Sequence, residues 1–491
     1  MTSGATSGSS SLPRRRWRTP AWPSSSSRRP SPSGRHAIGQ GTRATSKPML
    51  DSARRRVRLA APQLAIPAVL LMGLAHGVGL MAPDVAVRPR LSLSADAPGG
   101  MCELGQTVTF TAQVVNTSGD ELHGKLRWEL ETLAFDAPVV EPVPIEVEGR
   151  GTASYHYILE MKVPGFVRVS CFVSEDGEER EVKRHRRIGC EPTAIQSELT
   201  REPDFGEFWN TSLDELSKVQ PEYELKEIPR KKGAGARRYE VIMRSHGGVR
   251  VRGWLEVPSS EGPHAALLRV PGYSQNMRPV NNTRGMIVLS LNVRGHGNSV
   301  DDVPGQPTDF WIRGLDLKET YYYRGAYLDC VRAVDYLTSR EDVDPDKIAI
   351  WGGSQGGGLA FATAALDPRI DLCVADIPWL CDWINYSRLV PKDDAMINWL
   401  AAKETRTEAS VLRTLSYFDT MNLADRIQCT TIMGVGLQDS ICPPSTSFAT
   451  FNRITAPHDY RIYEDSGHGL GGDHYMWVVG EVQEIFGSEK R

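Results

Sequence analysis

The chain has 491 residues, with 60 acidic and 57 basic side chains and a formal net charge of −3. This length exceeds one α/β domain of ordinary size, so we expect a second folded unit. The near balance of charge argues against a general role in binding nucleic acid or a charged membrane surface.

The first 58 residues contain many Ser, Pro, Arg and Gly residues and few large apolar ones. Two arginine triplets, at 14–16 and 54–56, concentrate basic charge in this segment. Such a composition cannot bury enough apolar surface to offset the conformational entropy lost on folding. We therefore predict that residues 1–58 are disordered.

An apolar stretch at residues 59–83 directly follows the second arginine triplet. A basic cluster followed by an apolar run is the order found in secretory signal peptides, which predicts export to the periplasm or the outside of the cell. The alternative is a membrane anchor, because residues 59–81 reach the ~20 residues needed to span a bilayer. Pro62, Pro67 and His76 weaken a spanning helix and favour export.

Residues 84–190 change to short runs in which apolar and polar residues alternate, with turn formers between them. Several such runs in succession predict an all-β sandwich resembling an immunoglobulin-like domain. The segment has no Ser/His/Asp arrangement of its own, so we expect it to pack against a catalytic domain. Shaping the cleft and binding glycan are the alternatives. The runs are 91–94, 107–115, 125–130, 152–158 and 165–173.

Eight cysteines are few for a chain of this length, and none has a C-x-x-C spacing, which argues against a zinc site. An exported protein can form disulfides. On that basis Cys102 and Cys171 are candidates for a pair within the sandwich, with Cys190 as a second candidate partner, and the sequence leaves the connectivity open.

The clearest element of residues 195–491 is a strand, turn and helix at 348–366. Apolar residues lead into Gly352-Gly353-Ser354-Gln355-Gly356, which fits G-x-S-x-G, and strong helix formers follow. Such an elbow holds a serine in a strained conformation, where only flanking glycines let strand and helix approach. An ordinary glycine-rich loop is the alternative, but the placement between strand and helix favours a nucleophile at Ser354.

A serine nucleophile needs a histidine base and a carboxylate that orients it. In α/β folds with such an elbow, the carboxylate follows the serine in sequence and the histidine follows the carboxylate. An apolar run at 430–436 ends in a loop with Asp439, and a turn cluster at 464–469 holds His468. We assign these residues as orienter and base. The competing residues are Asp425 and Asp465 for the carboxylate and His474 for the base.

A tetrahedral intermediate also needs two N–H donors for its oxyanion. Gln355, the residue after the nucleophile, supplies the first. The second belongs on the loop after an early strand, and the strand-like run 265–270 is followed by a turn that places the Tyr273 amide there. A surface aromatic residue on a turn is the alternative interpretation of Tyr273.

Longer motifs occur around these residues, among them Gly353-Ser-Gln-Gly-Gly357, Ala375-Asp-Ile-Pro-Trp-Leu-Cys-Asp382 and Gly436-Leu-Gln-Asp-Ser-Ile-Cys-Pro-Pro-Ser-Thr446. With them, the chain from about residue 202 to its end resembles the acetyl xylan esterase and cephalosporin C deacetylase family, carbohydrate esterase family seven.

The resemblance implies an α/β-hydrolase fold, with a doubly wound and mostly parallel sheet. It implies the triad Ser354, Asp439 and His468, with oxyanion amides from Tyr273 and Gln355. The activity it implies is removal of acetyl groups from short xylo-oligosaccharides and other small acetyl esters, through an acyl-serine intermediate. It implies no metal and no organic cofactor.

Two positions depart from the family pattern. The Arg-Gly-Gln motif of the family reads Arg294-Gly-His296 here, and its His-Glu pair reads His468-Gly469. The first change puts a titratable imidazole near the expected active face, which makes His296 a candidate for the substrate pocket. The second removes a carboxylate beside the base. The resemblance to the family therefore does not predict the substrate preference or the pH dependence of this protein.

Aromatic residues lie on both sides of the elbow in sequence. Trp379 and Trp383 are candidates for a lid or an acyl-pocket wall, although aromatic clusters more often belong to the core. Tyr321, Tyr322 and Tyr323 begin an amphipathic helix, and we expect core packing for at least one of them.

Three classes of function remain open at this level. The first is a serine carboxylesterase for acetylated sugars or similar small esters. The second is a serine peptidase or lactone hydrolase, since fold and triad do not choose the acyl group. The third is a non-catalytic glycan-binding or envelope protein. Family members similar to this domain often form ring-like oligomers, so a homo-oligomer is one expectation, which the added N-terminal domain would oppose by blocking those contacts.

Overall fold

The computed structural model describes residues 89–231, 235–303, 305 and 307–487. Residues 1–83, for which the sequence predicts a disordered segment and then a signal peptide or anchor, lie outside the described residues. Among the residues described, no helix is both long enough and apolar enough to cross a membrane.

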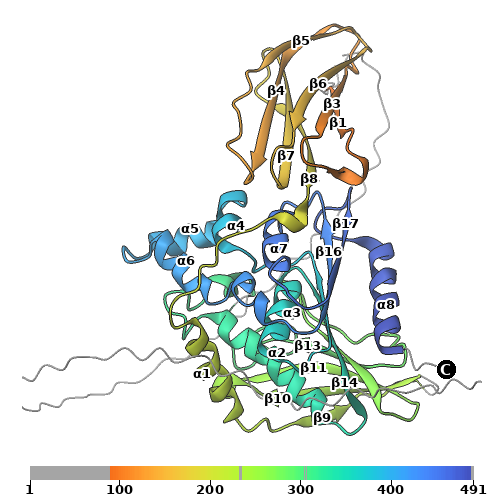
Figure 1. The fold of residues 1–491 in the computed structure, drawn as a ribbon, viewed down its shortest axis with the longest axis vertical. Helices are drawn as coiled ribbons and strands as arrows, with labels where there is room; N and C mark the ends of the chain where they lie inside the picture. Colours follow the sequence, from red (N-terminus) through yellow and green to blue (C-terminus); the bar gives the residue numbers. More distant parts are fainter. Residues whose placement is uncertain (1–88, 232–234, 304, 306, 488–491) are drawn as a thin grey trace, which may run out of the picture. The chain divides into compact units, whose positions relative to one another are not determined.

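Two β-sheets form the part of the chain between residues 90 and 190 (Figure 1). One has the order β1-β3-β6 and the other β2-β8-β7-β4-β5, and every pair is antiparallel except β2 with β8. Alternation along β3 buries Val108 and Phe110 in a core with Trp128 and Val169. The strands are β1 Arg90–Ala95, β2 Met101–Cys102, β3 Thr107–Val115, β4 Leu122–Thr132, β5 Val143–Val147, β6 Thr152–Glu160, β7 Gly165–Glu175 and β8 Glu181–Cys190.

All eight cysteines are free thiols, so the candidate pairing of Cys102 with Cys171 is wrong. Cys102 is on β2 and Cys171 is on β7, and β8 lies between these strands. Two strand spacings amount to roughly 10 Å, which is more than a disulfide can bridge. Cys190, the second candidate partner, lies opposite Cys102 in the β2/β8 register, and both thiols are reduced.

A nine-stranded sheet follows, in the order β17-β16-β15-β14-β12-β13-β11-β10-β9. Neighbours among β12 to β17 are parallel, and β11, β10 and β9 are added antiparallel at one edge. This is the predicted mostly parallel sheet of an α/β-hydrolase. The strands are β9 Glu224–Glu227, β10 Ala236–Arg244, β11 Arg250–Pro258, β12 His264–Arg269, β13 Ile287–Asn292, β14 Val343–Gly353, β15 Leu372–Asp376, β16 Thr430–Gly436 and β17 His458–Tyr463.

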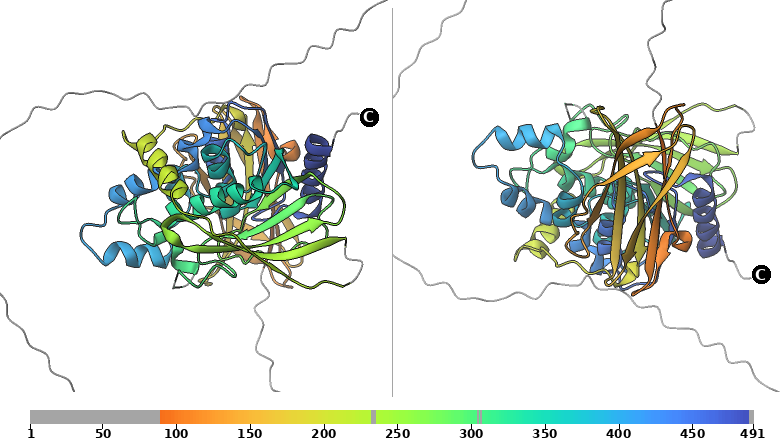
Figure 2. Two further views of the ribbon diagram at one scale, coloured as in Figure 1. Left: turned by 90° about the horizontal axis from the view of Figure 1, so that it is seen from below. Right: turned by 90° about the horizontal axis from the view of Figure 1, so that it is seen from above.

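Helices cover both faces of this sheet, so its central strands are apolar on both sides. Ile348 and Ile350 of β14 share a buried cluster with residues of α1, α2, α3 and α7, whereas Ala349 packs with Val478 and Val482 of α8. In both views of Figure 2, dark-blue α8 and light-blue α5 and α6 lie on opposite sides of the molecule. The helices are α1 Phe205–Ser217, α2 Tyr322–Thr338, α3 Gln355–Leu366, α4 Trp383–Leu389, α5 Asp394–Ala401, α6 Glu408–Ser416, α7 Pro444–Phe451 and α8 Gly471–Gly487.

The tyrosines at the start of α2 are core residues. Tyr321, Tyr322 and Tyr323 are all buried, and each side-chain hydroxyl donates a hydrogen bond inside the protein. Their hydroxyls are thereby satisfied without water, as buried polar groups require. The expectation of core packing for at least one of them is confirmed.

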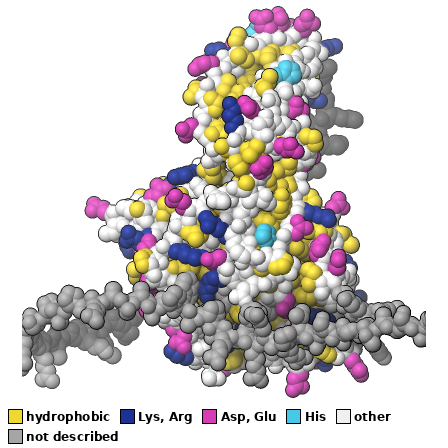
Figure 3. Space-filling model, in the orientation of Figure 1, with side chains coloured by type: hydrophobic (Ala, Val, Ile, Leu, Met, Phe, Trp, Pro, Cys, Tyr) yellow, Lys and Arg dark blue, Asp and Glu magenta, His cyan; other side chains and the backbone are white. Residues whose placement is uncertain are grey.

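Acidic and basic side chains lie close together on the face of the molecule shown in Figure 3. Across the described residues many of them form ion pairs, such as Arg406 with Asp316 and Arg250 with Asp302. Opposite charges placed in this way compensate each other at short range, in keeping with the formal net charge of −3.

Candidate active site

Ser354 lies in the sharp turn that joins strand β14 to helix α3. Its backbone has φ 58° and ψ −120°, a conformation that residues with a side chain rarely adopt. Its N–H donates to the carbonyl oxygen of Asp376 on the neighbouring strand, at 2.9 Å. Glycine is required in this turn, since a Cβ at Gly352 would lie 2.5 Å from the backbone of Gly356. The turn therefore has the strained geometry expected of a nucleophile elbow.

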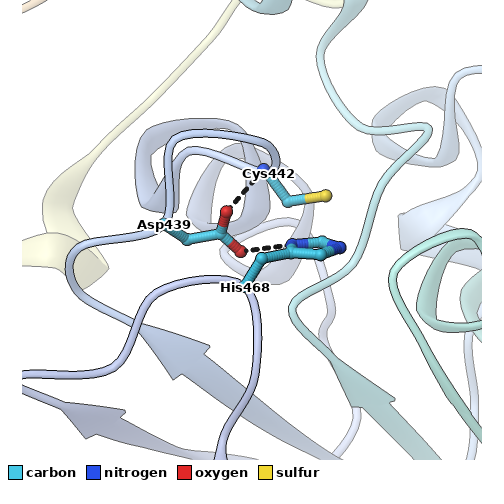
Figure 4. Close-up of side chains that lie close together, drawn as sticks. All are labelled: Asp439, Cys442 and His468. Atoms are coloured by element: carbon cyan, nitrogen blue, oxygen red, sulfur yellow. Dashed lines mark hydrogen bonds and ion pairs between the residues drawn. The ribbon is translucent and has the colours of Figure 1, made fainter. Parts of the chain in front are cut away.

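His468 connects Ser354 with Asp439 through two hydrogen bonds. Its Nε2 atom is 3.0 Å from Ser354 Oγ, and its Nδ1 atom is 2.8 Å from Asp439 Oδ2. Figure 4 shows the second of these contacts. A proton on Nδ1, facing the carboxylate, leaves the Nε2 lone pair for the serine hydroxyl. The three residues follow β14, β16 and β17, and parallel strands bring their carboxyl ends to one edge of the sheet.

Asp439 is fully buried, and the protein provides partners for both of its carboxylate oxygens. Oδ1 accepts hydrogen bonds from the backbone N–H groups of Ile441 at 2.8 Å and Cys442 at 2.9 Å. Oδ2 faces His468. These donors stabilise a negative charge that would otherwise be costly away from water. The carboxylate is thus fixed in place and points at the imidazole.

Asp439, Cys442 and His468 also form a group whose candidate metal-ligand atoms all lie within 4.8 Å of one another (Figure 4). Burial raises the pKa of the Cys442 thiol, and a hydrogen bond with Ser354 opposes this rise only in part. A protonated thiol is a poor metal ligand. Since both oxygens of Asp439 already accept hydrogen bonds, the donor set fits an acid–base triad better than a metal site.

The competing residues have other partners. His474 is buried, with Nε2 2.7 Å from Asp376 Oδ1 and Nδ1 3.1 Å from the Tyr463 hydroxyl. Asp425 and Asp465 each pair with an arginine and are exposed to solvent. The geometry therefore favours Asp439 over the two other carboxylates and His468 over the other histidine.

Gln355, the first residue of α3, is fully buried next to Ser354. Its Nε2 donates to the carbonyl oxygens of Pro271 at 3.3 Å and Gly272 at 3.4 Å, and its Oε1 accepts from the Tyr323 hydroxyl at 2.6 Å. These bonds tie the elbow to the loop that carries Tyr273. The first N–H groups of a helix have no intrahelical partner, so the Gln355 amide is suited to bind an oxyanion.

His296 does not line the cavity at Ser354, and its predicted place in the substrate pocket is wrong. The turn after β13 folds its ring into the protein, where it is fully buried. Nδ1 lies 3.2 Å from the Tyr322 hydroxyl and Nε2 lies 3.4 Å from Gln355 Nε2. The amide nitrogen can only donate, so this contact requires a neutral imidazole. In agreement, burial lowers the pKa of His296.

A cavity of about 300 Å³ opens at Ser354, and apolar side chains form most of its wall. Trp379 and Trp383 lie in this wall as predicted, with ring centroids 5.5 Å apart. Tyr273 packs edge-on against Trp379, also at 5.5 Å. The sequence did not predict the contribution of helices α5 and α6, which supply Met396, Val411 and Leu415.

Comparison with known proteins decides the family. The family model described as acetyl xylan esterase (AXE1) matches residues 193–479, which is more than half of the chain. The chain belongs to the acetyl xylan esterase family. It is therefore a serine ester hydrolase, and the family predicted from the motifs is confirmed.

Individual relatives of the acetyl xylan esterase family agree with this assignment. Acetyl esterase Axe7A of Xylanibacter ruminicola is 30% identical over 341 residues, which cover 66% of this chain and 76% of that protein. The solved acetyl xylan esterase from Paenibacillus sp. R4 has 33% identity and a TM-score of 0.56. The one from Thermoanaerobacterium sp. JW/SL YS485 has 30% identity and a TM-score of 0.55. Each structure covers 60% of this chain and is itself covered to 98%.

The two departures from the acetyl xylan esterase pattern have different structural settings. At the first, His296 replaces the glutamine of the family motif in a fully buried position. At the second, a Cβ on Gly469 would meet nothing within 4 Å, so the backbone leaves room for a side chain. The second departure therefore removes a carboxylate without a steric reason, whereas the first changes the packing behind the elbow.

Proposed function

We propose that this acetyl xylan esterase removes acetyl groups from short xylo-oligosaccharides and similar small acetyl esters. The observation that carries the proposal is the hydrogen-bonded series of Ser354, His468 and Asp439 beside an apolar cavity of about 300 Å³. Membership of the family supports acetate as the acyl group.

In the first half-reaction, Ser354 Oγ attacks the acetyl carbonyl carbon while His468 Nε2 takes the hydroxyl proton. Asp439 stabilises the imidazolium that forms. The carbonyl oxygen becomes an oxyanion, for which the amides of Tyr273 and Gln355 are the proposed donors. The imidazolium then protonates the sugar oxygen, the ester C–O bond breaks, and the sugar leaves with a free hydroxyl.

Water completes the second half-reaction. His468, again neutral, accepts a proton from a water molecule whose oxygen attacks the carbonyl carbon of acetyl-Ser354. Collapse of the second tetrahedral intermediate breaks the bond to Ser354 Oγ, which takes back the proton on His468, and releases acetic acid, which ionises to acetate in solution. One imidazole thus acts in turn as base and acid in both half-reactions.

The size and lining of the cavity suit an ester of a small acyl group with a cyclic alcohol such as a sugar. Its volume of about 300 Å³ lies at the lower end of the range for small-molecule sites. The aromatic faces of Trp379 and Trp383 are suited to pack against a sugar ring. Lys392 and Glu408 also line the cavity, where they form an ion pair with each other at 3.3 Å, and their remaining hydrogen-bonding capacity suits sugar hydroxyls. These features favour a sugar ester over a peptide.

The test measures acetate release from acetylated xylo-oligosaccharides and from p-nitrophenyl acetate. We expect the wild-type protein to hydrolyse both, and Ser354→Ala to lower kcat by about 10³-fold or more, because the nucleophile is lost. Ser217→Ala removes an exposed serine at the end of α1 and serves as the control. Intact acetylated xylo-oligosaccharides together with cleavage of a peptide amide would exclude the proposal.

A further inference from the structure

Strand β8 of the N-terminal sheets contacts the loop that ends at Asp439. Arg187 on this strand is only 4% exposed. Its Nη1 donates to the carbonyl oxygens of Leu437 at 3.0 Å and of Asp439 at 2.5 Å. Its backbone N–H donates to Gln438 Oε1 at 2.7 Å. One arginine therefore binds three consecutive residues of the loop that presents the catalytic carboxylate.

Gln438 extends this contact to the loop of the catalytic histidine. Its Nε2 donates to the carbonyl oxygens of Arg187 at 3.1 Å and of Glu464 at 2.9 Å. Its backbone N–H donates to the carbonyl oxygen of Ser466 at 2.9 Å. Because Ser466 lies two residues before His468, the loops of orienter and base share one hydrogen-bond network with β8.

The burial of Arg187 is costly unless its donors are used. Burial lowers the pKa of its guanidinium to about 10, and the nearby cation of Arg168 acts in the same direction. Its acidic neighbour Glu131 is 4.0 Å from Nη2, and Glu131 also forms an ion pair with Arg168. The short hydrogen bonds of the Arg187 guanidinium therefore go to backbone carbonyl oxygens of the Asp439 loop. This loop is the main hydrogen-bond partner of the buried cation.

The position of Asp439 tolerates little movement. The carboxylate must stay within hydrogen-bond distance of His468 Nδ1, and such bonds weaken steeply when length or angle changes. A misplacement of about 1 Å in a catalytic group can lower a rate by about 10²-fold. Residues 437–439 have already left strand β16. The N–H of Leu437 still donates to the carbonyl oxygen of Tyr463 on β17 at 3.0 Å, but Gln438 and Asp439 lie beyond the sheet.

We propose that Arg187 is a positioning residue of this esterase, through which strand β8 holds the Asp439 loop in the geometry that turnover requires. The inference rests on the proposed function of the triad. It gives the N-terminal sheets a part in catalysis beyond packing, although they contribute no residue that touches the reacting atoms.

The direct test replaces Arg187 with methionine, which keeps an extended side chain and removes its donors. We expect kcat for p-nitrophenyl acetate to fall about 10- to 100-fold while KM changes by less than about threefold, since the cavity wall is untouched. Arg187→Lys keeps a cation and N–H donors, so its kcat should exceed that of Arg187→Met by at least about threefold. A merely structural role would produce neither this division between kcat and KM nor the partial recovery.

Arg127→Met is the matched control. Arg127 is a partly exposed arginine on β4 whose ion pairs with Glu129 and Glu181 stay within the N-terminal sheets. We expect its kcat within about twofold of wild type. Gln438→Met removes the side-chain bonds of Gln438 to the backbones of Arg187 and Glu464 but keeps the guanidinium bonds, so it should lower kcat in the same direction, even if Arg187→Met fails to fold. Circular dichroism reports whether each variant is folded.

The outcomes separate this inference from the proposed function. Folded Arg187→Met and Gln438→Met proteins with kcat within about twofold of wild type would overturn the inference, and so would an equal loss of kcat in Arg127→Met. If the wild-type protein itself releases no acetate, the proposed function fails instead. An active wild type with unaffected Arg187 variants rejects the positioning role alone.

Discussion

Two histidines contact the turn that carries the nucleophile, and their surroundings give them different chemistry. The His468 side chain is 26% exposed and lies between Ser354 and Asp439, where a proton can be accepted and returned. His296 is fully buried and accepts a hydrogen bond from Gln355, which requires a neutral ring. The environment thus makes one imidazole a candidate base and the other a support for the elbow.

Burial of His296 makes the stability of the protein depend on pH. Its pKa lies below the ordinary value of 6.5. The His296 imidazole therefore stays neutral in the folded protein at pH values at which the same side chain binds a proton in the unfolded chain. The free energy of unfolding therefore falls as the pH drops below about 6.5, by up to about 1.4 kcal/mol per pH unit, until the lowered pKa is reached. We expect His296→Gln to lose less stability than wild type between about pH 7 and about pH 5, as measured by urea unfolding.

The control for this prediction is His458→Gln. His458 is an exposed residue of β17, so its replacement removes an imidazole from the surface and leaves the buried ring of His296 in place. Glutamine is the residue of the family motif at position 296, which favours a folded and active variant. An unfolding free energy that falls as steeply in His296→Gln as in wild type would show that the buried imidazole is not the cause.

At the scale of residues, the sequence was sufficient to select Ser354, Asp439 and His468, because each follows a recognisable strand and they occur in the order that the fold requires. His296 could not be placed in the same way. Its loop lies at the expected edge of the sheet, but the direction of its ring depends on packing against Phe310 and Tyr322. Such tertiary contacts leave no local pattern in sequence.

At the scale of elements, three short helices between β15 and β16 shape the cavity. Val411 of α6 is 6% exposed and lies in the wall. A tryptophan there would take up part of the cavity of about 300 Å³ and leave room for the smallest acyl groups. We expect Val411→Trp to lower kcat/KM for p-nitrophenyl butyrate at least about tenfold more than for p-nitrophenyl acetate.

Ala409 gives the matched control, because it lies on the same helix and is exposed to solvent. Ala409→Trp adds the same ring outside the cavity and should leave the ratio of the two kcat/KM values unchanged. If Val411→Trp lowers activity on both esters equally, α6 does not limit the size of the acyl group.

The elements that the sequence missed share a physical cause. Five of the eight N-terminal strands were predicted from alternating apolar residues. Of the other three, β2 and β5 have only two and five residues, and β8 begins with mostly charged residues and buries only its last four. Helices α4 to α6 are seven to nine residues long, which is too short for a clear helical period. Strand β8 and helices α4 to α6 contact the candidate site, where residues are selected for the cavity and its contacts and not for a regular local pattern.

At the scale of the whole molecule, the apolar core of the catalytic sheet continues into β7. Phe166 of β7 is 3% exposed, belongs to the same buried cluster as Ile350 of β14, and packs against Phe448 of α7 with ring centroids 5.6 Å apart. Val167, the next residue of β7, belongs to the separate core of the N-terminal sheets. The sequence predicted two folded parts. It did not predict that they share a buried cluster, because this depends on which aromatic side chains pack together in the folded protein.

Shared burial of this kind predicts that the described β-rich and α/β parts unfold together. Phe166→Ala should lower the free energy of unfolding by about 3 to 5 kcal/mol, because it leaves a cavity between β7 and α7. The midpoint temperature of unfolding measured by circular dichroism and the temperature at which esterase activity is lost should then fall by the same amount. Phe172→Ala is the control: its ring lies on the same strand against Arg127 and Lys183, so its loss should be smaller. Loss of β structure in a separate step, while activity on p-nitrophenyl acetate persists, would contradict a single cooperative unit and would also weaken the role assigned to β8.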